Sequence, residues 1–543
     1  MHNNLITLFC ACAMAATVSG AHATGNITAT DKETTSCCRN SWTDGNTAVG
    51  QMIEDSRIVA LQDVGAKAMP KMIAPIGKMP FKMKQLQRPT FKSQTERITT
   101  ADTDAAGKIT RALNDKIAQL SKHGGGRVVV PAGHWLTGRI ELKSGIDLHL
   151  DEGCILEFSA DIADYQPAVF TRHEGIEVMG AGAFIYANKA RNIALTGSGK
   201  VMGPPMDVEM RRLKNGNSVV EKDIDYRMPV GERLCDGLDG RTFYRPKSFA
   251  PINCRGVLVE GVTFERSVLW NINPIYCQDV IIRGVTVNSV GVPSGDGIDI
   301  SSCKNVLIEY STLNCGDDCF TLKSGRAEDG LRVGKPTENV VIRYCLAEKG
   351  HGGITCGSET AAGVQNVYLH HCVFNGTRTG FRFKTRRNRG GGIWDIYYDN
   401  VRLIDVCEAF TWDLLGTEMY MGKLAQRNPP LAVTRLTPTV KGIRISNFVI
   451  ESADRMMGMN TIPESPTTGI VIENGAVRTN RIFKALNDVA GLTLRNLTIQ
   501  ATDSCVTVDN SRGITFDNVK FYVPGGKLNI SLKGEKAVTP TIM

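Results

Sequence analysis

The chain has 543 residues, of which 42% are hydrophobic and 22% are charged. This balance excludes an intrinsically disordered chain, and no segment beyond the first 23 residues approaches the roughly 18 uninterrupted apolar residues of a membrane-spanning helix. The formal net charge of +8 favours an acidic partner. No nucleic-acid-binding motif accompanies the charge, so we expect no nucleic acid partner and no membrane span.

The first 23 residues have the pattern of a secretory signal peptide. Residues 5–20 form an apolar stretch followed by Ala-His-Ala at 21–23, the small-x-small pattern that signal peptidase cleaves. The stretch is short for a retained membrane anchor, and a lipid-modified Cys10 is a further alternative. We expect residues 1–23 to be removed and the protein to be periplasmic or secreted, where an anionic polysaccharide fits the charge.

A helix is predicted after an irregular N-terminal extension. Residues 24–95 have weak periodicity and many polar and Pro residues, which indicates an extension wrapping the domain that follows. Residues 108–123 then carry apolar side chains at helical spacing, and the glycines at 124–126 end this helix. We expect the helix to cap the N-terminal end of a repeat domain over residues 96–543, with a strand at 128–130 directly after it.

A short unit with alternating apolar residues recurs along the rest of the chain. It begins with an apolar-x-apolar triplet, continues through two polar or small residues and closes with a second apolar group. The copies begin at Val257, Val280, Val306, Val340, Val367, Ile396, Ile443, Leu492 and Ile514.

The spacing of these copies predicts the fold class. Four of the gaps between neighbouring copies are 22 to 27 residues long, which is one coil of several short strands. Alternating apolar residues facing inward, with each coil pairing with the next, indicate an all-β fold: a right-handed parallel β-helix of the pectin-lyase-like type with an N-terminal capping helix. The wider gap between Val306 and Val340 predicts an inserted loop over 326–338.

The cysteines of the repeat are expected to be buried thiols. Sixteen cysteines in an exported chain would suggest disulfides. Cys254, Cys277, Cys345 and Cys372, however, sit at the same place in the repeat, which favours stacked thiols over bridges. The neighbouring residues Cys37 and Cys38 are candidates for oxidation, but the sequence indicates no partner.

Three carboxylates on successive coils are candidates for acid and base chemistry. Asp296 lies in Ser-Gly-Asp-Gly-Ile-Asp, and Asp317 with Asp318 lies in Cys-Gly-Asp-Asp-Cys. The offset from Asp296 to Asp317 is close to one coil, so these side chains should stack on one flank. We expect Gly316 to permit the bend that lets Asp317 and Asp318 share a groove. Crowded carboxylates can keep one group protonated as an acid while its neighbours act as bases.

The next two coils supply an imidazole and two cations. His351 lies between glycines that would leave room for a sugar ring, and Arg382 and Lys384 follow at i, i+2 spacing around Phe383. This spacing puts both cations on one face of a strand and Phe383 in the core. Arg382 and Lys384 would pair with a sugar carboxylate. Taken alone, each of these groups is more often a solvated turn, a structural histidine or a solvated strand face; their order along the chain favours a site.

These motifs resemble glycoside hydrolase family 28, the polygalacturonases and their relatives. The likeness runs from about residue 100 to 415 and includes the Gly-Asp-Asp, Gly-His-Gly and Arg-x-Lys segments in the family's order. The resemblance implies a secreted bacterial enzyme that hydrolyses α-galacturonosidic linkages in pectic polysaccharide or oligogalacturonides with inversion, without metal or cofactor.

The resemblance also implies the roles of the site residues. Asp317 would be the general acid, Asp296 and Asp318 would activate water, and His351 would support the acid. Arg382 and Lys384 would bind the galacturonate carboxylate. One segment departs from the family: its Asn-Thr before the first catalytic Asp is here Ser294-Gly295, which leaves homogalacturonan and rhamnogalacturonan open as substrates.

Two other functions on the same fold remain as alternatives. A pectate lyase would need a calcium cage and a cationic base, and its product would absorb in the near ultraviolet. A non-catalytic saccharide-binding β-helix would lose nothing on substitution of Asp317. Long insertions over 205–245 and 408–441 favour a pocket and therefore exo action. We expect a monomer, and we expect Trp270 and Trp412 to pack under loops rather than to line the groove.

Overall fold

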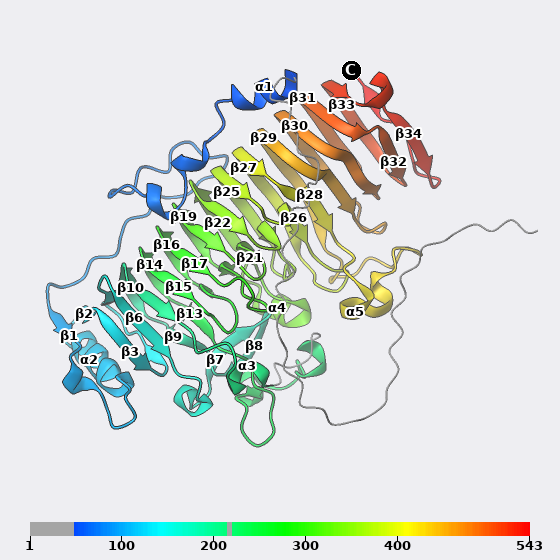
Figure 1. Cartoon of the computed structure of the whole chain (residues 1–543). Coiled ribbons are helices and arrows are strands. Elements are labelled where there is room, and N and C mark those ends of the chain that lie inside the picture. The colour runs from blue at the N-terminus through cyan, green and yellow to red at the C-terminus, as the bar shows by residue number, and fades with distance from the viewer. Residues whose placement is uncertain (1–47, 214–219) are drawn as a thin grey trace, which may run out of the picture. The chain divides into compact units, whose positions relative to one another are not determined.

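The computed structural model describes residues 48–213 and 220–543. The predicted signal peptide, Cys37, Cys38 and the first part of the expected extension, residues 24–47, lie outside this part of the chain. The described chain folds as the predicted right-handed parallel β-helix (Figure 1). The predicted repeat sets its register, because Val257 pairs with Val280, Val280 with Val306, and Val306 with Val340.

The strands stack in three columns, one for each side of the coil. The first column carries the predicted apolar triplets. It contains β1 (Thr95–Arg97), β2 (Gly126–Val130), β5 (Ile146–Leu150), β10 (Arg191–Gly197), β14 (Arg255–Glu260), β16 (Gln278–Arg283), β19 (Lys304–Glu309), β22 (Thr337–Arg343), β25 (Val364–Asn375), β27 (Gly392–Ile404), β29 (Thr439–Asn460), β30 (Thr468–Asn487), β31 (Ala490–Asp503), β33 (Arg512–Tyr522) and β35 (Thr541–Ile542).

The second and third columns complete each coil, and several long strands from β25 onward bend to run through two columns. The second contains β3 (Gly133–Thr137), β6 (Cys154–Phe158), β11 (Lys200–Met202), β15 (Thr263–Glu265), β17 (Thr286–Asn288), β20 (Thr312–Asn314) and β23 (Leu346–Lys349). The third contains β4 (Ile140–Glu141), β9 (Ala183–Asn188), β13 (Lys247–Ile252), β18 (Ile298–Ser301), β21 (Phe320–Lys323), β24 (Gly352–Cys356), β26 (Thr379–Lys384), β28 (Val406–Asp413), β32 (Cys505–Asp509) and β34 (Asn529–Lys533).

The structure contains coils that are not among the predicted copies of the repeat. Ile470 in β30 pairs with Ile443 on one side and Leu492 on the other, so the gap between those two predicted copies contains a complete coil. Ile193 in β10 likewise pairs with Val257 and extends the repeat toward the N-terminus.

The predicted capping helix is present as α2 (Thr110–Lys122). Its apolar stripe, Leu113, Ile117 and Leu120, is buried against the first coils and belongs to the continuous core of the β-helix. Gly124 and the two glycines after it have positive φ and turn the chain directly into β2. The helix therefore covers apolar surface that an open first coil would expose.

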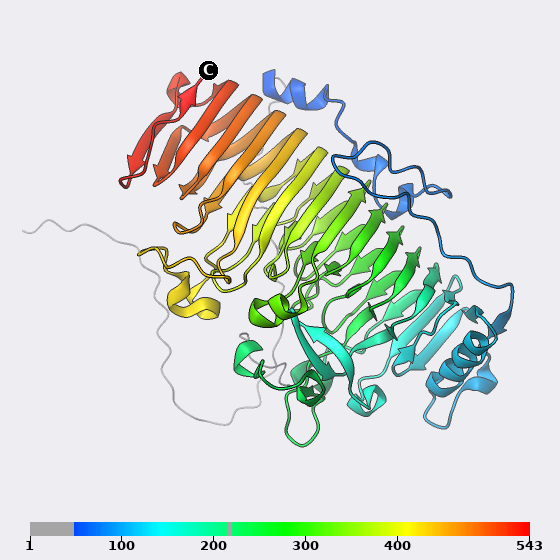
Figure 2. The same ribbon diagram turned by 180° about the vertical axis from the view of Figure 1, so that it is seen from behind.

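The described part of the N-terminal extension, residues 48–94, is a strap along the outer face of the first column. It contains the helix α1 (Ala48–Glu54) and short 3-10 turns but no strand within these residues, and Figures 1 and 2 show it running beside the stack. Ile76 and Leu86 cover outward-facing apolar residues of five coils, among them Leu258 and Leu307. The strap therefore spans several coils rather than the first ones alone.

Arginines of the sheet hold the strap through its backbone. Arg283 donates to the carbonyl of Pro70 at 2.6 Å, and Arg343 donates to the carbonyls of Ala74 and Pro75 at 2.7 and 2.9 Å. Arg283 and Arg343 also pair with the fully buried Glu309.

Asparagine side chains form a ladder at the bend inside the first column. Asn339 donates to Asn305 at 3.2 Å, and Asn366 donates to Asn339 at 3.1 Å. These residues have φ between 53° and 58°, the left-handed region that Asn tolerates better than most residues. Asn447, Asn474, Asn496 and Asn518 form a second ladder in the later coils, four residues after the first residue of the inward triplet rather than one residue before it.

The cysteines are buried thiols, as predicted, but they occupy two positions rather than one. Cys254, Cys277 and Cys303 lie three residues before the inward triplet of their coils, whereas Cys345 and Cys372 lie five residues after its first residue. All five are free and buried. Cys407 is disulfide-bonded.

Insertions extend from the edge that follows the third column. On this side of the stack (Figure 1) lie the hairpin β7 (Val169–His173) and β8 (Ile176–Gly180), the described residues 204–213 and 220–246 with α3 (Glu209–Arg212) and β12 (Leu234–Cys235), α4 (Ala327–Val333) and the segment 414–438 with α5 (Glu418–Met421). The predicted loop at 326–338 contains α4, and the second predicted insertion begins at residue 414 because β28 continues to Asp413. Among the described residues, no helix combines the length and apolarity needed to cross a lipid bilayer.

Candidate active site

The third column presents a row of polar side chains on its outer face. Phe320, Ile354 and Phe381 lie inward in register, so the residues next to them in sequence point outward. The outward residues in this register include Thr321, Thr355 and Arg382, with Asp299 on the preceding coil.

Asp296 and Asp318 occupy the same position on successive coils. Ile298 pairs with Phe320, and the amide of Gly297 donates to the carbonyl of Asp318 at 3.0 Å. The expected stacking of carboxylates on one flank is therefore present, with Asp318 rather than Asp317 in register with Asp296. Both aligned side chains are nearly inaccessible, whereas that of Asp317 is 28% exposed.

Asp317 contacts His351 from the next coil. Nδ1 of His351 lies 3.1 Å from Oδ1 of Asp317, and the His351 side chain is 53% exposed. The hydrogen bond to Asp317 raises the pKa of His351. Burial opposes ionisation of Asp317, but the hydrogen bond from His351 and the charge of Lys384 together lower the pKa of Asp317 to about 2.

Asp318 contacts both predicted cations. Nη1 of Arg382 lies 3.2 Å from its Oδ1, and Nζ of Lys384 lies 3.8 Å from its Oδ2. The predicted common face of Arg382 and Lys384 is therefore present, and Phe383 between them is fully buried. Before any substrate binds, the two cations already compensate a buried carboxylate.

The glycines of this region act through close contact, which differs from the prediction. Gly316 does not have a positive φ; a Cβ there would lie 2.2 Å from the carbonyl oxygen of Val292. A Cβ at Gly352 would lie 2.7 Å from Oδ1 of Asp318. Gly352 next to His351 therefore leaves room for the Asp318 carboxylate rather than for a sugar ring.

A buried lysine that the sequence analysis missed lies beside Asp296. Nζ of Lys323 lies 3.2 Å from Oδ2 of Asp296 and 2.7 Å from Oδ1 of Asp299. The alternation in β21 carries the signal, because Phe320 and Leu322 face inward and leave Thr321 and Lys323 outward. The i, i+2 argument that placed Arg382 and Lys384 applies here too.

The surroundings of Asp296 disfavour its ionisation. Burial, added to repulsion from Asp299, Asp317 and Asp318, raises the pKa of Asp296 well above its usual range, although Lys323 opposes this. Against the effect of burial, Asp299 and Asp296 raise the pKa of Lys323. The crowded acids are therefore unequal: the pKa of Asp296 is raised, whereas that of Asp317 is lowered.

The two tryptophans that could line the groove differ in environment. Trp412 is fully buried and its ring stacks on Phe383 with centroids 4.7 Å apart, which confirms packing. Trp270 is also buried, but Nζ of Lys323 lies 3.6 Å from its ring centroid. Trp270 therefore supports the charged cluster directly.

Inserted segments meet beside the cluster although they are far apart in sequence. Glu221, from the segment 220–246, accepts a hydrogen bond from Arg326 at 2.7 Å and one from Arg389 at 2.9 Å. The amide of Gly390 donates to the carbonyl of Leu436 at 2.9 Å. These contacts join the segments 220–246, 385–391 and 414–438 into one wall along the strand ends.

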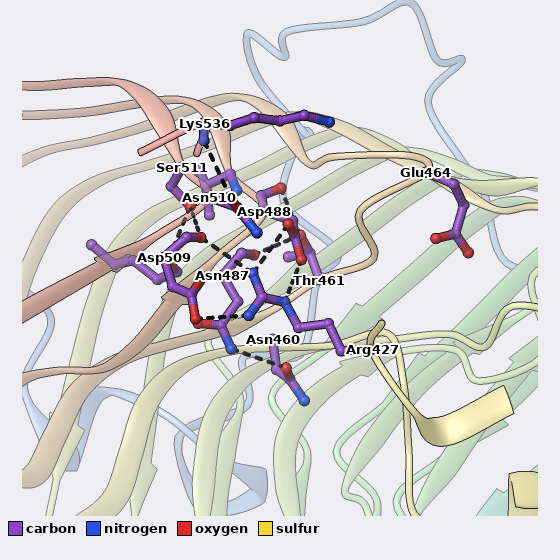
Figure 3. Close-up of polar contacts among 12 residues, drawn as sticks. Arg427, Asn460, Thr461, Glu464, Asn487, Asp488, Asp509, Asn510, Ser511 and Lys536 are labelled. Carbon is purple, nitrogen blue, oxygen red and sulfur yellow. Dashed lines mark hydrogen bonds and ion pairs between the residues drawn. The ribbon is translucent and has the colours of Figure 1, made fainter. Parts of the chain in front are cut away.

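The segment 414–438 is fastened to the later coils by one arginine. The guanidinium of Arg427 pairs with Asp488 at 2.6 Å and with Asp509 at 2.8 Å, in the cluster shown in Figure 3. Nearby, Arg387 donates to the carbonyls of Leu424 and Arg427. The segment is therefore held on both sides beside the strand ends of β26 and β28.

Together, the cluster offers an acid, bases and cations within four coils. A glycosidic bond needs a proton donor for the leaving oxygen and a base for water, and the three aspartates are the candidate groups. In residues 48–213 and 220–543, no group of three or more His, Cys, Asp or Glu side chains is arranged to hold a metal ion. The fold and the site define a glycoside hydrolase built on a parallel β-helix.

Comparisons with known proteins agree with this class. The sequence profile of glycosyl hydrolases family 28 matches residues 239–411. A probable polygalacturonase of Vitis vinifera is 27% identical over 397 residues, which cover 70% of this chain and 74% of the relative. An exo-poly-alpha-D-galacturonosidase of Dickeya chrysanthemi is 26% identical over 298 residues, covering 51% of this chain and 49% of the relative.

Solved structures give the same result. An exopolygalacturonase of Thermotoga maritima superposes with a TM-score of 0.65 and 28% identity, covering 76% of this chain and 93% of that chain. A family 28 exopolygalacturonase of Yersinia enterocolitica, with a TM-score of 0.55, 19% identity and coverage of 83% of this chain and 78% of that chain, shares the fold. Residues 239–411 thus match family 28 of the glycosyl hydrolases, and the chain is similar over most of its length to polygalacturonases.

Proposed function

We propose that the protein hydrolyses α-galacturonosidic linkages of pectic polysaccharide with inversion of configuration. The observation that carries the proposal is the placement of Asp296, Asp317 and Asp318 beside Arg382 and Lys384 on four neighbouring coils. The carboxylates supply acid and base, and the two cations suit a uronate carboxylate. The polygalacturonase relatives support this substrate class.

In this proposal, each residue has a defined role. Asp317, the most exposed of the three aspartates, protonates the leaving oxygen, and His351 orients it through the 3.1 Å contact. Asp318 and Asp296 accept a proton from the attacking water. Arg382 and Lys384 bind the carboxylate of the sugar.

Substrate binding must move the proton toward Asp317, because the free site lowers its pKa. Part of that lowering comes from the charge of Lys384. A substrate carboxylate paired with Lys384 compensates this charge and raises the pKa of Asp317. The uronate group thereby helps to protonate the acid that cleaves its own linkage, and the three aspartates titrate as one set.

The test compares Asp317→Asn with the native protein on homogalacturonan oligosaccharides. We expect kcat to fall about 10³-fold, since the amide cannot donate as an acid. Asp115→Asn is the matched control, because Asp115 is an exposed helix residue with a side chain 73% exposed. Full turnover by Asp317→Asn contradicts the assignment of the acid.

Product analysis separates the alternatives on the same fold. An inverting hydrolase gives the β-anomer first, which proton NMR detects, whereas a lyase product absorbs in the near ultraviolet. Rhamnogalacturonan oligosaccharides belong in the same assay because Ser294-Gly295 replaces the family's Asn-Thr. A Cβ at Gly295 would lie 2.8 Å from the carbonyl oxygen of Val292, so a larger residue does not fit this turn unchanged.

We further propose that the enzyme acts from a chain end. The support is the wall that Glu221 joins to Arg326 and Arg389, since it brings the segment 220–246 beside the coil of Arg382. The exo-acting relatives also support it. Release of a single small product from the first minutes is expected, and a ladder of mid-sized oligomers contradicts exo action.

The site of action is proposed from the sequence alone. We propose that residues 1–23 direct export to the periplasm or medium and that the mature enzyme is a monomer. N-terminal sequencing of protein from a secreting host tests cleavage after Ala23, and sedimentation tests the oligomeric state. An intact N-terminus or a dimer contradicts the respective proposal.

A further inference from the structure

Lys323 is held on three sides and is not placed to bind substrate. Its Nζ lies 2.7 Å from Oδ1 of Asp299, 3.2 Å from Oδ2 of Asp296 and 3.6 Å from the ring centroid of Trp270. An ammonium group has three N–H donors. Two carboxylates and one aromatic face use all three directions, and the Lys323 side chain is only 7% exposed.

The Asp299 side of this cluster is rigid. Asp299 is fully buried, and the hydroxyl of Thr321 on the next coil also donates to its Oδ1. Asp299 thus fixes the ammonium of Lys323, and Lys323 in turn fixes one oxygen of Asp296. Within the described chain, the other oxygen of Asp296, Oδ1, accepts no hydrogen bond, which leaves it for a water molecule.

We propose that Lys323 is a positioning residue that orients Asp296 and favours its ionised form, so that Asp296 can accept a proton from the attacking water. The proposal rests on the hydrolase function proposed above. Lys323 acts through Asp296 and does not touch the sugar. Asp299 and Trp270 hold Lys323 in place.

The charges around this pair determine the expected response to pH. Asp299, Asp317, Asp318 and Lys323 act on Asp296. Beyond them, Glu359 acts on Lys323, and Lys247 faces Asp299. Removing the cation disfavours ionised Asp296, whereas removing the Asp299 charge favours it. The two changes must therefore move the acidic limb of the pH profile in opposite directions.

The test measures kcat and KM on galacturonate oligosaccharides from pH 3.5 to 8 for Lys323→Met and Asp299→Asn. For Lys323→Met we expect kcat to fall about 100-fold with KM within about twofold of the native value, and the acidic limb to rise by about one pH unit. For Asp299→Asn we expect the limb to move to lower pH. The exposed Lys304, which pairs with Glu338 in the first column, provides the control Lys304→Met with an unchanged limb.

Several results overturn the proposal. An acidic limb that stays in place in both variants, with only a lowered melting temperature, means that Lys323 is purely structural. A raised KM with unchanged kcat means that Lys323 binds the sugar. If Lys323→Met does not fold, Asp299→Asn still gives the direction of the limb. Inactive native enzyme overturns the hydrolase function as well, whereas active native enzyme with unmoved limbs overturns only the role of Lys323.

Discussion

At the residue scale, a single missing methyl group determines where the base of the site lies. A Cβ at Gly352 would meet Oγ1 of Thr355 first and would lie 2.7 Å from Oδ1 of Asp318. Both crowded atoms belong to side chains, so the hydroxyl and the carboxylate would move rather than the backbone. The identity of residue 352 therefore controls the position of Asp318.

Gly352→Ala is expected to lower kcat about 100-fold, because displacing a reacting group by about 1 Å has effects of this size. The backbone of Gly352 does not have a positive φ, so the fold should persist. Steady-state kinetics and a melting curve measure the two effects. Gly231→Ala is the control, since a Cβ at Gly231 meets nothing within 4 Å. Equal activity in both variants contradicts this account of Asp318.

The pair of Asp317 and His351 predicts a pH window of stability. The raised pKa of His351 means that its contribution is full below the ordinary His pKa, about 6.5, and is lost as the pH rises through the folded value. The pKa of Asp317, lowered to about 2, means that its contribution is full above about pH 4 and is lost as the pH falls toward 2. The pair therefore stabilises the fold most between about pH 4 and 6.5.

His351→Gln tests this window by urea unfolding at pH 5.5 and pH 9. We expect the variant to lose less than about 1 kcal/mol at pH 5.5, because the histidine is half exposed and solvent screens the pair. At pH 9 the loss should be smaller. A loss that is equal at both pH values would show that the ion pair is not its source.

The site residues that could be predicted are those whose motifs follow one another along the chain at the spacing of the coils. Short motifs on successive coils predicted the residues that the structure brings together: Asp296, Asp317, Asp318, His351 and the cation pair. The contact of Lys323 with Asp296 was missed because it joins the end of one strand to the turn before another. Inward and outward side chains alternate in β21 as they do in β26, but only the alternation in β26 was used to predict site residues.

At the element scale, the path of the strap is determined by its contacts with the sheet rather than by a pattern in its own sequence. Its carbonyls at Pro70, Ala74 and Pro75 accept hydrogen bonds from Arg283 and Arg343. A backbone carbonyl has the same chemistry in every residue, so the strap carries no periodic signal that would predict its path. The sequence analysis therefore identified an irregular extension but not the coils that it covers.

Arg343→Met is expected to lower the free energy of unfolding by about 3 kcal/mol, since it removes a partner of the fully buried Glu309. Hydrogen exchange should rise over residues 70–91 as the strap loses two anchors. Exchange followed by mass spectrometry measures both the site and the extent. Arg111→Met, at a helix side chain that is 92% exposed, is the control and should change stability by less than about 0.5 kcal/mol. Unchanged exchange in the strap would contradict its anchoring by Arg343.

At the scale of the whole molecule, the repeat was the most predictable feature. The first residues of the triplets found in the sequence are register partners in the stack, as Val257 and Val280 show. This agreement arises because one inward position per coil must be apolar in every coil. Insertions follow no such rule, and the contact of Glu221 with Arg389 crosses 168 residues of sequence.

The net charge of +8 predicts a dependence of substrate binding on salt. Between about 0.05 and 0.5 M sodium chloride, KM for polygalacturonate should rise about threefold with little change in kcat, because salt screens attraction between a cationic protein and an anionic polymer. Melting curves at both salt concentrations control for unfolding. A constant KM would show that binding is governed by contacts inside the site rather than by the field of the protein.

The buried thiols allow the opening of the stack to be followed by chemical labelling. Burial raises the pKa of Cys277 and of Cys345 well above the ordinary value, so both are neutral and shielded from alkylating reagents in the folded protein. Cys505 is the exposed free thiol among the described cysteines. Labelling of any other free cysteine in that part of the chain would show that its coil had separated from its neighbours. A time course of labelling would therefore report the order in which the coils separate.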